Sequence, residues 1–140
     1  MPAGLPRRLG AMLYDALLLA ALWLVTTAAF LPFTGGEALS VQRTPVLEYI
    51  YRAALVAVLA GFYGLSWTSR GQTLGMASWR LRVEREDGRM LTWTDSLLRL
   101  AAALLSWLAF GLGWLNVLVD PRKRTWHDRL TNTRVVVLPR

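Results

Sequence analysis

One carboxylate lies inside a long apolar stretch near the start of the chain, and it is the side chain best placed to do chemistry. Asp15 is the only charged residue between Leu9 and Leu31, a run of 23 residues. A charge at the centre of a membrane helix costs about 2.5–3.5 kcal/mol, so it usually has a partner and a purpose. A carboxylate in such a place binds a proton or a hard cation. The sequence therefore predicts a candidate ion or proton site at Asp15.

Arg8 is the nearest candidate partner of this carboxylate. It precedes Asp15 by seven positions, which is close to two helical turns, so both side chains fall on one face of a helix. Asp15 lies only about 9 Å into the apolar run, nearer one edge of a membrane than its midplane. Two interpretations stay open. Either Asp15 takes part in moving a cation or proton, or it forms a structural ion pair with Arg8 or with a residue of the C-terminal tail.

The tail, residues 120–140, contributes Asp120, His127 and Asp128 as further candidate site residues. His127 is the only histidine and the chain has no cysteine, so the pattern predicts neither a metal site nor thiolate chemistry. The serines stand outside any nucleophile-elbow motif, which argues against a hydrolase. We therefore expect a protein that is not an enzyme, with no metal and no cofactor.

The elements that must hold these residues are membrane helices. The chain has 140 residues, of which 54% are hydrophobic and only 18% charged, against about 25% charged in soluble domains. The apolar residues cluster into three segments, at about 9–31, 46–67 and 97–119. About 20 apolar residues suffice to cross a bilayer as a helix. The composition predicts a single all-α integral membrane domain over residues 1–140, multi-pass in the inner (plasma) membrane.

The path of the third segment has two possible solutions. It contains Gly111-Leu112-Gly113, where it either continues across the membrane or turns back as a re-entrant hairpin. If it turns back, every basic residue except Arg43 and Arg52 lies on one side, which fits the positive-inside rule. Both solutions place the N-terminus in the cytoplasm.

A polar cytoplasmic stretch, residues 69–95, is expected to carry a small β-hairpin-like element. Residues 79–84 alternate apolar and charged side chains, which is the period of a half-buried strand. Asp87-Gly88 is a turn signal, with residues 90–93 on its far side. A second strand-like run, residues 133–138, is also a candidate to pair with residues 79–84.

The net charge of +7 is explained by the membrane rather than by nucleic acid. Basic residues that flank membrane segments meet the anionic headgroups of the cytoplasmic leaflet. No nucleic-acid-binding motif with interleaved aromatic residues is present in the sequence. We expect an anionic lipid surface as a partner, and no nucleic acid.

The order and spacing of several short motifs resemble the RDD family of small, mainly bacterial membrane proteins. The resemblance covers nearly the whole chain and rests on Arg8, Asp15, Gly71-Gln72-Thr73-Leu74-Gly75, Asp120-Pro121, Trp126-His127-Asp128-Arg129-Leu130 and Thr133. It implies that Arg8 is the family's arginine and Asp15 its first aspartate. The second aspartate is Asp120 or Asp128, and the His-Asp-x-Leu-x-x-Thr pattern favours Asp128.

The resemblance implies a transport-related role, with cation–proton exchange as the specific form. So few spans can hardly enclose a pathway, so this hypothesis predicts a homo-oligomer or a membrane partner protein. The alternative hypothesis is a non-catalytic structural or assembly subunit, whose buried charges and tail dock it to another complex.

Overall fold

The computed structural model describes residues 1–36 and 45–139. This part of the chain is mostly helical and contains one small sheet. The loop predicted between the first two apolar segments includes residues 37–44, which lie outside the described residues, as does Arg140. The elements in chain order are α1 (Leu5–Thr34), α2 (Pro45–Ser69), α3 (Leu74–Ser78), β1 (Leu81–Arg85), α4 (Trp93–Leu108), α5 (Leu112–Val119), α6 (Trp126–Leu130) and β2 (Thr133–Val137).

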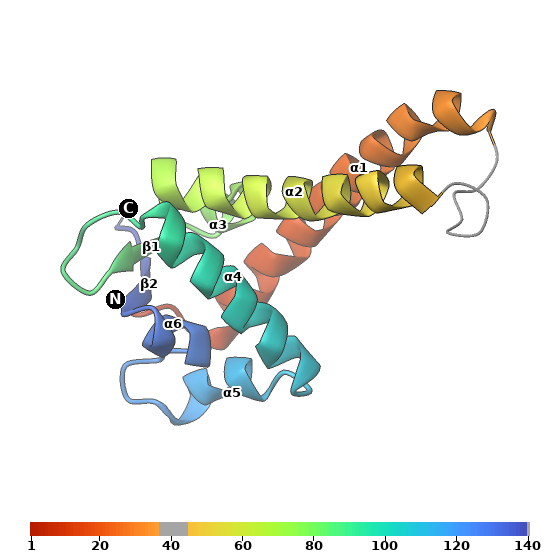
Figure 1. Cartoon of the computed structure of the whole chain (residues 1–140). Helices are drawn as coiled ribbons and strands as arrows, with labels where there is room; N and C mark the ends of the chain where they lie inside the picture. Colours follow the sequence, from red (N-terminus) through yellow and green to blue (C-terminus); the bar gives the residue numbers. More distant parts are fainter. Residues whose placement is uncertain (37–44, 140) are drawn as a thin grey trace.

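The first two apolar segments form α1 and α2, of 30 and 25 residues, and each is long and apolar enough to cross a membrane. Both helices extend away from the sheet toward the opposite end of the molecule (Figure 1). α1 runs past residue 31, where the first apolar segment was predicted to end, and includes Pro32. It continues through the proline to Thr34 and ends at Gly35, which adopts the left-handed conformation with φ 63°.

The third apolar segment is broken at the predicted glycines. α4 and α5 are separated by a bend of 98°. Gly111 provides the left-handed conformation of the turn, with φ 75°, and Phe110 before it also has a positive φ. At 1.5 Å per residue, the 16 residues of α4 reach about 24 Å, which is less than the roughly 30 Å of a bilayer core. A single straight third span is therefore not formed.

The sheet is confirmed, but the predicted local hairpin is wrong in its partner. β1 pairs antiparallel with β2, which lies about 50 residues later, with Leu81 opposite Val137 and Arg85 opposite Thr133. The turn at Asp87-Gly88 forms, with Gly88 at φ 82°, but residues 90–92 add no strand. Instead Thr92 caps α4 in a reciprocal capping box with Asp95. Val135 and Val137 of β2 lie opposite Val83 and Leu81, and the four side chains pack in or against the apolar core.

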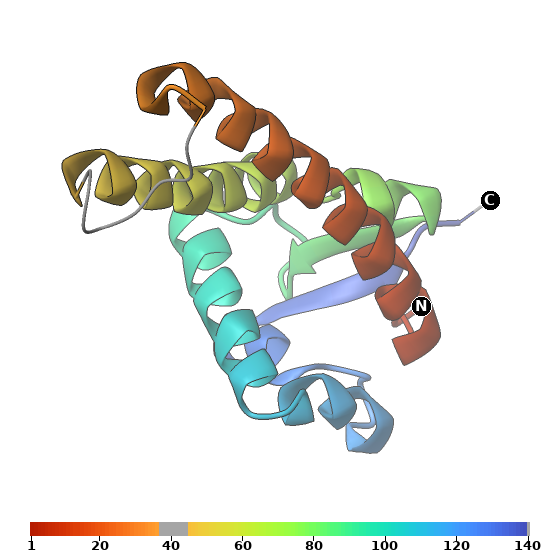
Figure 2. The ribbon, with the colours of Figure 1, turned by 90° about the vertical axis from the view of Figure 1, so that its right-hand side faces the viewer.

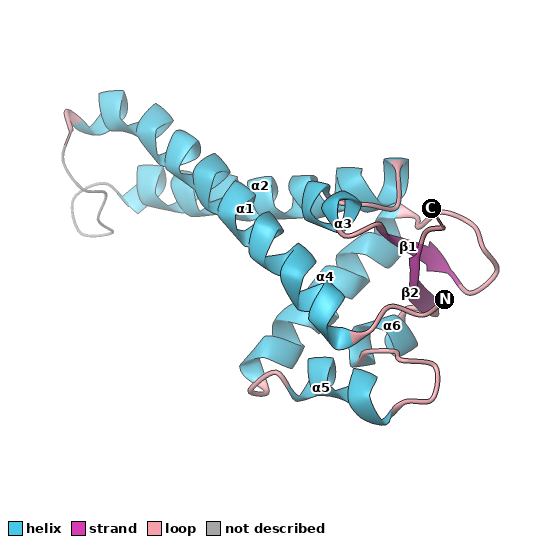
Figure 3. Ribbon diagram, turned by 180° about the vertical axis from the view of Figure 1, so that it is seen from behind, coloured by secondary structure: helices cyan, strands magenta, loops and turns pink. Residues whose placement is uncertain are grey.

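The N-terminus joins this sheet, so three distant parts of the chain meet at one end of the molecule. Pro2 forms an isolated bridge with Val136, and the Ala3 amide donates to the Val135 carbonyl at 3.0 Å. Both termini lie beside the two strands (Figure 2, Figure 3). Because β1 precedes α4, β2 follows α5 and the two strands pair, the chain leaves this end of the molecule in α4 and returns to it after α5. The buried apolar core lies at this end and comprises Ala3, Ala11, Trp67, Met76, Leu81, Val83, Leu91 and Val135.

Candidate functional site

Asp15 is buried in α1, and its carboxylate is bound by the segment that follows α2. The Thr73 hydroxyl donates to one oxygen, and the Gly75 amide donates to the other at 2.9 Å. Thr73 also caps α3, because its hydroxyl accepts from the Met76 amide at 3.1 Å. Asp15 therefore fixes the short helix α3 against α1 through two neutral donors.

Gly75 is required by this close approach. A Cβ atom at position 75 would overlap the Ala11 carbonyl oxygen and would lie 2.7 Å from an Asp15 carboxylate oxygen. Because a side chain would push α3 away from α1, the amide of residue 75 can reach the carboxylate only if that residue is glycine. This explains the physical role of one glycine in the Gly71–Gly75 motif.

The alternative in which Asp15 forms an ion pair with Arg8 or with a residue of the tail is wrong, because its carboxylate binds Thr73 and Gly75. The Arg8 guanidinium instead donates to the Asp128 carboxylate at 2.6 Å, to the Lys123 carbonyl at 2.8 Å and to the Ala3 carbonyl at 3.2 Å. Seven residues of helix separate Arg8 and Asp15 by about 10 Å along the axis, although they share a face. Asp128, which lies in the tail, is level with Arg8 along α1 and binds it in place of Asp15.

Asp128 is the centre of a buried charge cluster, which comprises Arg8, Arg99 and Asp128. One carboxylate oxygen accepts from Arg8 and the other accepts from Arg99 of α4. The three residues are at most 4% exposed. Arg99 also donates to the Thr133 hydroxyl at 2.6 Å, so the cluster ties the start of α1, α4, α6 and β2 together.

The helix-capping role of Asp128 adds to these ion pairs. The carboxylate accepts from the Thr125 amide at 3.0 Å, while the Thr125 hydroxyl accepts from the Asp128 amide, which is a capping box for α6. Burial alone would raise the pKa of Asp128, but the neighbouring charges of Arg99 and Arg8 outweigh it and hold that pKa well below its ordinary value. The carboxylate is therefore ionised at any physiological pH.

His127 lies beside this cluster and is neutral. Its ring is 1% exposed and packs on Trp114, with 4.4 Å between the ring centroids. Burial, reinforced by the charge of Arg99, lowers the pKa of His127 from 6.5 to about 3. Within residues 1–36 and 45–139, no group of three His, Cys, Asp or Glu side chains is arranged to hold a metal ion.

Asp120 lies apart from the other predicted site residues. Its carboxylate accepts from the backbone amide of Arg124 at 2.9 Å and from the Arg124 guanidinium at 3.1 Å. Arg124 in turn binds Glu86 at 2.8 Å. The structure therefore brings Arg8, His127 and Asp128 together and leaves Asp120 in a surface ion-pair network.

A cavity of about 330 Å³ joins the two groups of buried residues. Arg8, Asp15, Arg99 and His127 line it, together with Tyr63 of α2. The rest of its wall is mainly apolar and includes Ala11, Leu19, Leu59, Trp67, Met76, Leu100, Ala103, Leu104, Trp107 and Trp114. A mostly apolar cavity with a few convergent polar groups is the usual form of a small-ligand site.

Arg99 is the important site residue that the sequence analysis missed. It was counted among the basic residues of the cytoplasmic side. The available signal was its position at the start of the third apolar segment, where a buried charge indicates a function or a partner. Thr73 and Thr133 belong to the motifs of the family resemblance, but nothing in the sequence indicated that they would bind Asp15 and Arg99.

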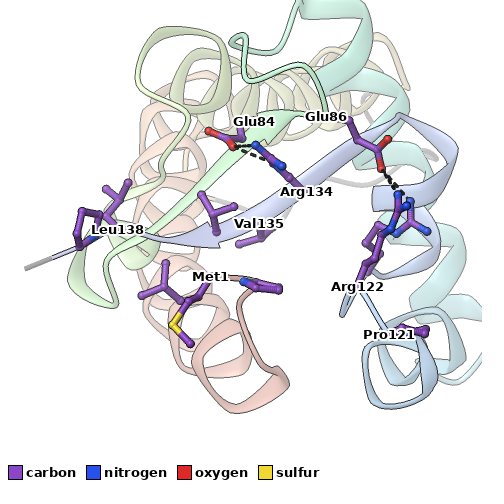
Figure 4. Close-up of a pocket in the computed structure, with 13 residues that line it drawn as sticks. Met1, Glu84, Glu86, Pro121, Arg122, Arg134, Val135 and Leu138 are labelled. Atoms are coloured by element: carbon purple, nitrogen blue, oxygen red, sulfur yellow. Dashed lines mark hydrogen bonds and ion pairs between the residues drawn. The ribbon is translucent and has the colours of Figure 1, made fainter.

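A second, larger pocket of about 660 Å³ lies on the surface beside β2 and the N-terminus. Figure 4 shows Glu84 paired with Arg134 on the strands and Glu86 facing Arg122. Met1 and Leu138 form part of its apolar floor. Because its charged residues are paired with one another, this pocket presents less free charge than its composition suggests.

These features define a class before they define a family. Two membrane-length apolar helices extend from an end of the molecule that holds a buried Arg–Asp cluster and a small sheet. The model of the RDD family matches residues 2–132 of the 140-residue chain. The chain therefore belongs to the RDD family, as its motifs predict. Comparisons with curated proteins and with solved structures find no significant match.

The two candidate aspartates should differ strongly in their contribution to stability. Asp128→Asn leaves two buried guanidinium groups without their counter-charge and should lower the free energy of unfolding by about 3–5 kcal/mol. Asp120→Asn weakens a partly exposed pair and should cost less than about 1 kcal/mol. Chemical unfolding of both variants in mild detergent measures the difference. Equal losses would contradict the central role of Asp128.

His127 should make the fold sensitive to acid. The pKa of His127 is about 3 in the folded chain and 6.5 in the unfolded chain, where the ring is neither buried nor close to Arg99. As the pH falls, the unfolded chain therefore takes up the proton first. The free energy of unfolding should therefore be highest above pH 6.5 and should fall between pH 6.5 and pH 3, by up to about 1.4 kcal/mol per pH unit. His127→Phe keeps a ring against Trp114 and removes the titration. Unfolding measured from pH 7 to 4 should show a shallower slope for the variant, and identical slopes would refute this prediction.

Proposed function

We propose that this RDD-family chain is a multi-pass protein of the inner (plasma) membrane with a transport-related role, in which Asp15 binds a proton or a monovalent cation for exchange. The observation that carries the proposal is the environment of the Asp15 carboxylate. It is buried, it lines a cavity, and its recorded partners in the described residues are two neutral donors, Thr73 and Gly75. Such a carboxylate can exchange one positive charge for another without breaking an ion pair.

The proposed placement in the membrane follows from the shape of the fold. α1 and α2 cross the bilayer, and the bent pair of α4 and α5 enters and returns on the same side. The sheet supports this topology, because β1 precedes α4, β2 follows α5, and the two strands pair. The N-terminus joins the same sheet, so it lies on that side as well. The many basic residues of this end support the proposal that it lies in the cytoplasm, against anionic headgroups.

Two spans and a re-entrant pair are too few to enclose a continuous pathway. The exchange proposal therefore includes a homo-oligomer or a membrane partner protein that completes the route from the cavity to the other side. It includes no enzymatic activity.

A structural or assembly role is the competing proposal, and the buried charge cluster favours it. Arg8, Arg99 and Asp128 already bind one another, and they tie the N-terminus, α4, α6 and β2 into one end of the fold. A subunit that docks a partner complex needs such a rigid end and needs no ion movement at Asp15. The flux experiment below separates the two proposals.

The topology predicts the labelling pattern of single cysteines, which the chain lacks naturally. Arg89→Cys in the turn after β1 and Arg122→Cys in the tail should both be protected from an impermeant thiol reagent added to intact cells. Gly36→Cys, at the opposite end of α1, should be labelled. Labelling of Arg122→Cys but not Arg89→Cys would show that α4 and α5 cross the membrane.

Ion exchange is tested with the purified full chain in liposomes that contain a pH-sensitive dye. A Na⁺ or Li⁺ gradient should drive proton movement in the wild type, and Asp15→Asn should reduce its rate at least about tenfold, because the neutral amide binds neither ion. Asp87→Asn, in an exposed turn, is the matched control and should keep the wild-type rate. Equal flux in the wild type and Asp15→Asn would exclude the carboxylate, and no flux in any of them would favour assembly.

A further inference from the structure

Several residues that line the cavity carry buried nitrogen atoms that the protein leaves without a hydrogen-bond partner. Four of its lining residues have a buried ring or guanidinium nitrogen with no hydrogen-bond partner in the part of the chain that the structure describes. These atoms are Trp67 Nε1, Arg99 Nε, Trp114 Nε1 and His127 Nδ1. A buried donor left unpaired costs about 1–3 kcal/mol, so such groups are rare unless they serve a ligand or water.

These four residues contact one another in pairs, and one of them, Arg99, carries a positive charge. The Arg99 guanidinium lies 5.3 Å from the centre of the Trp67 ring, and the Trp114 ring packs on His127. Asp128 binds both Arg8 and Arg99, so the Arg8–Arg99–Asp128 cluster keeps one net positive charge. Indole and guanidinium N–H groups around a net positive charge match an anionic head with several acceptor oxygens.

The remaining wall matches an apolar tail. Leu59, Leu100, Ala103, Leu104 and Trp107 line the cavity beyond the polar groups. Leu104 and Trp107 are also 47% and 55% exposed on α4, so this wall reaches the apolar surface of the molecule. A molecule dissolved in the hydrocarbon phase of the bilayer can therefore reach the cavity through this wall. The volume of the cavity, about 330 Å³, lies at the lower end of the usual range for ligand pockets.

We propose that this cavity is a binding site for an amphipathic monoanion, whose head binds Arg99, Trp67, Trp114 and His127 and whose apolar chain lies along α4. The head lies on the Arg99 side, since Asp15 lines the cavity from α1 and its oxygens face Thr73 and Gly75. The site does not require ion exchange at Asp15, although the negative charge of ionised Asp15 on the same wall opposes an anion there. A free carboxylate and an anionic lipid headgroup share this chemistry, and the experiment distinguishes them.

The test measures binding of labelled decanoate to the full chain in phosphatidylcholine nanodiscs, by equilibrium dialysis with empty nanodiscs as background. We expect saturable binding of about one decanoate per chain. Trp67→Phe and Trp114→Phe each remove one N–H that makes no hydrogen bond within the described protein, so folding should be kept while Kd rises about fivefold. Trp93→Phe is the control, because Trp93 does not line the cavity and should leave Kd unchanged.

Competing amphiphiles test the choice of head group. Decanol and decyltrimethylammonium carry the same tail and should displace decanoate poorly, and Asp15→Asn should bind it as tightly as the wild type or more tightly. Equal displacement by decanol, or unchanged Kd in both tryptophan variants, would overturn the anion site. The anion site would also be overturned if decyltrimethylammonium displaced decanoate from the wild type but not from Asp15→Asn. That result would assign the cavity to cations.

The source of the anion is read from a second set of nanodiscs. Phosphatidylglycerol could weaken decanoate binding more in the wild type than in Trp67→Phe. That result would support the site with a lipid headgroup as its occupant. Phosphatidylglycerol without effect, with saturable decanoate binding retained, would support a free amphipathic acid.

Discussion

The carboxylate of Asp128 lies between two guanidinium groups and has no exposed surface, and the arrangement of the whole end of the molecule that carries the sheet depends on it. Taking a charge out of water costs several kcal/mol per ion, and the cost is offset only when geometry and further hydrogen bonds are good. Asp128 meets that condition through Arg8, Arg99 and the Thr125 amide. Each of these partners comes from a different part of the chain, so the ion cannot be satisfied unless the start of α1, α4 and the tail meet.

This constraint explains why a small sheet can be stable here. A two-stranded sheet alone is marginal in water. β1 and β2 gain support because the N-terminus pairs with β2, because Thr133 at the start of β2 accepts from Arg99, and because Leu81 and Val83 are buried beneath the strands. The charge cluster and the sheet therefore stabilise each other, and together they hold α3 in reach of Asp15.

The helices and the break at Gly111 could be predicted from the sequence, because length, apolarity and glycine conformation are local properties. The partners of the buried charges could not. Helical periodicity placed Arg8 and Asp15 on one face, but a shared face does not decide which charge a guanidinium meets. That choice is made by Asp128, 120 positions away in the chain, and by the height of each group along α1. The pairing of β1 with β2 is non-local in the same way, and the turn signal at Asp87-Gly88 favoured a nearer partner, residues 90–93, that forms no strand.

The two buried groups also constrain each other through their charges. Arg8, Arg99 and Asp128 sum to one positive charge, and ionised Asp15 on the same cavity wall balances it. A cation or proton bound at Asp15 removes that balance and leaves a net positive charge in a medium where charges interact more strongly than in water. An anion near Arg99 would restore neutrality. Occupation of the Asp15 side should therefore favour occupation of the Arg99 side, and by reciprocity an anion bound near Arg99 should tighten the binding of a cation or proton at Asp15.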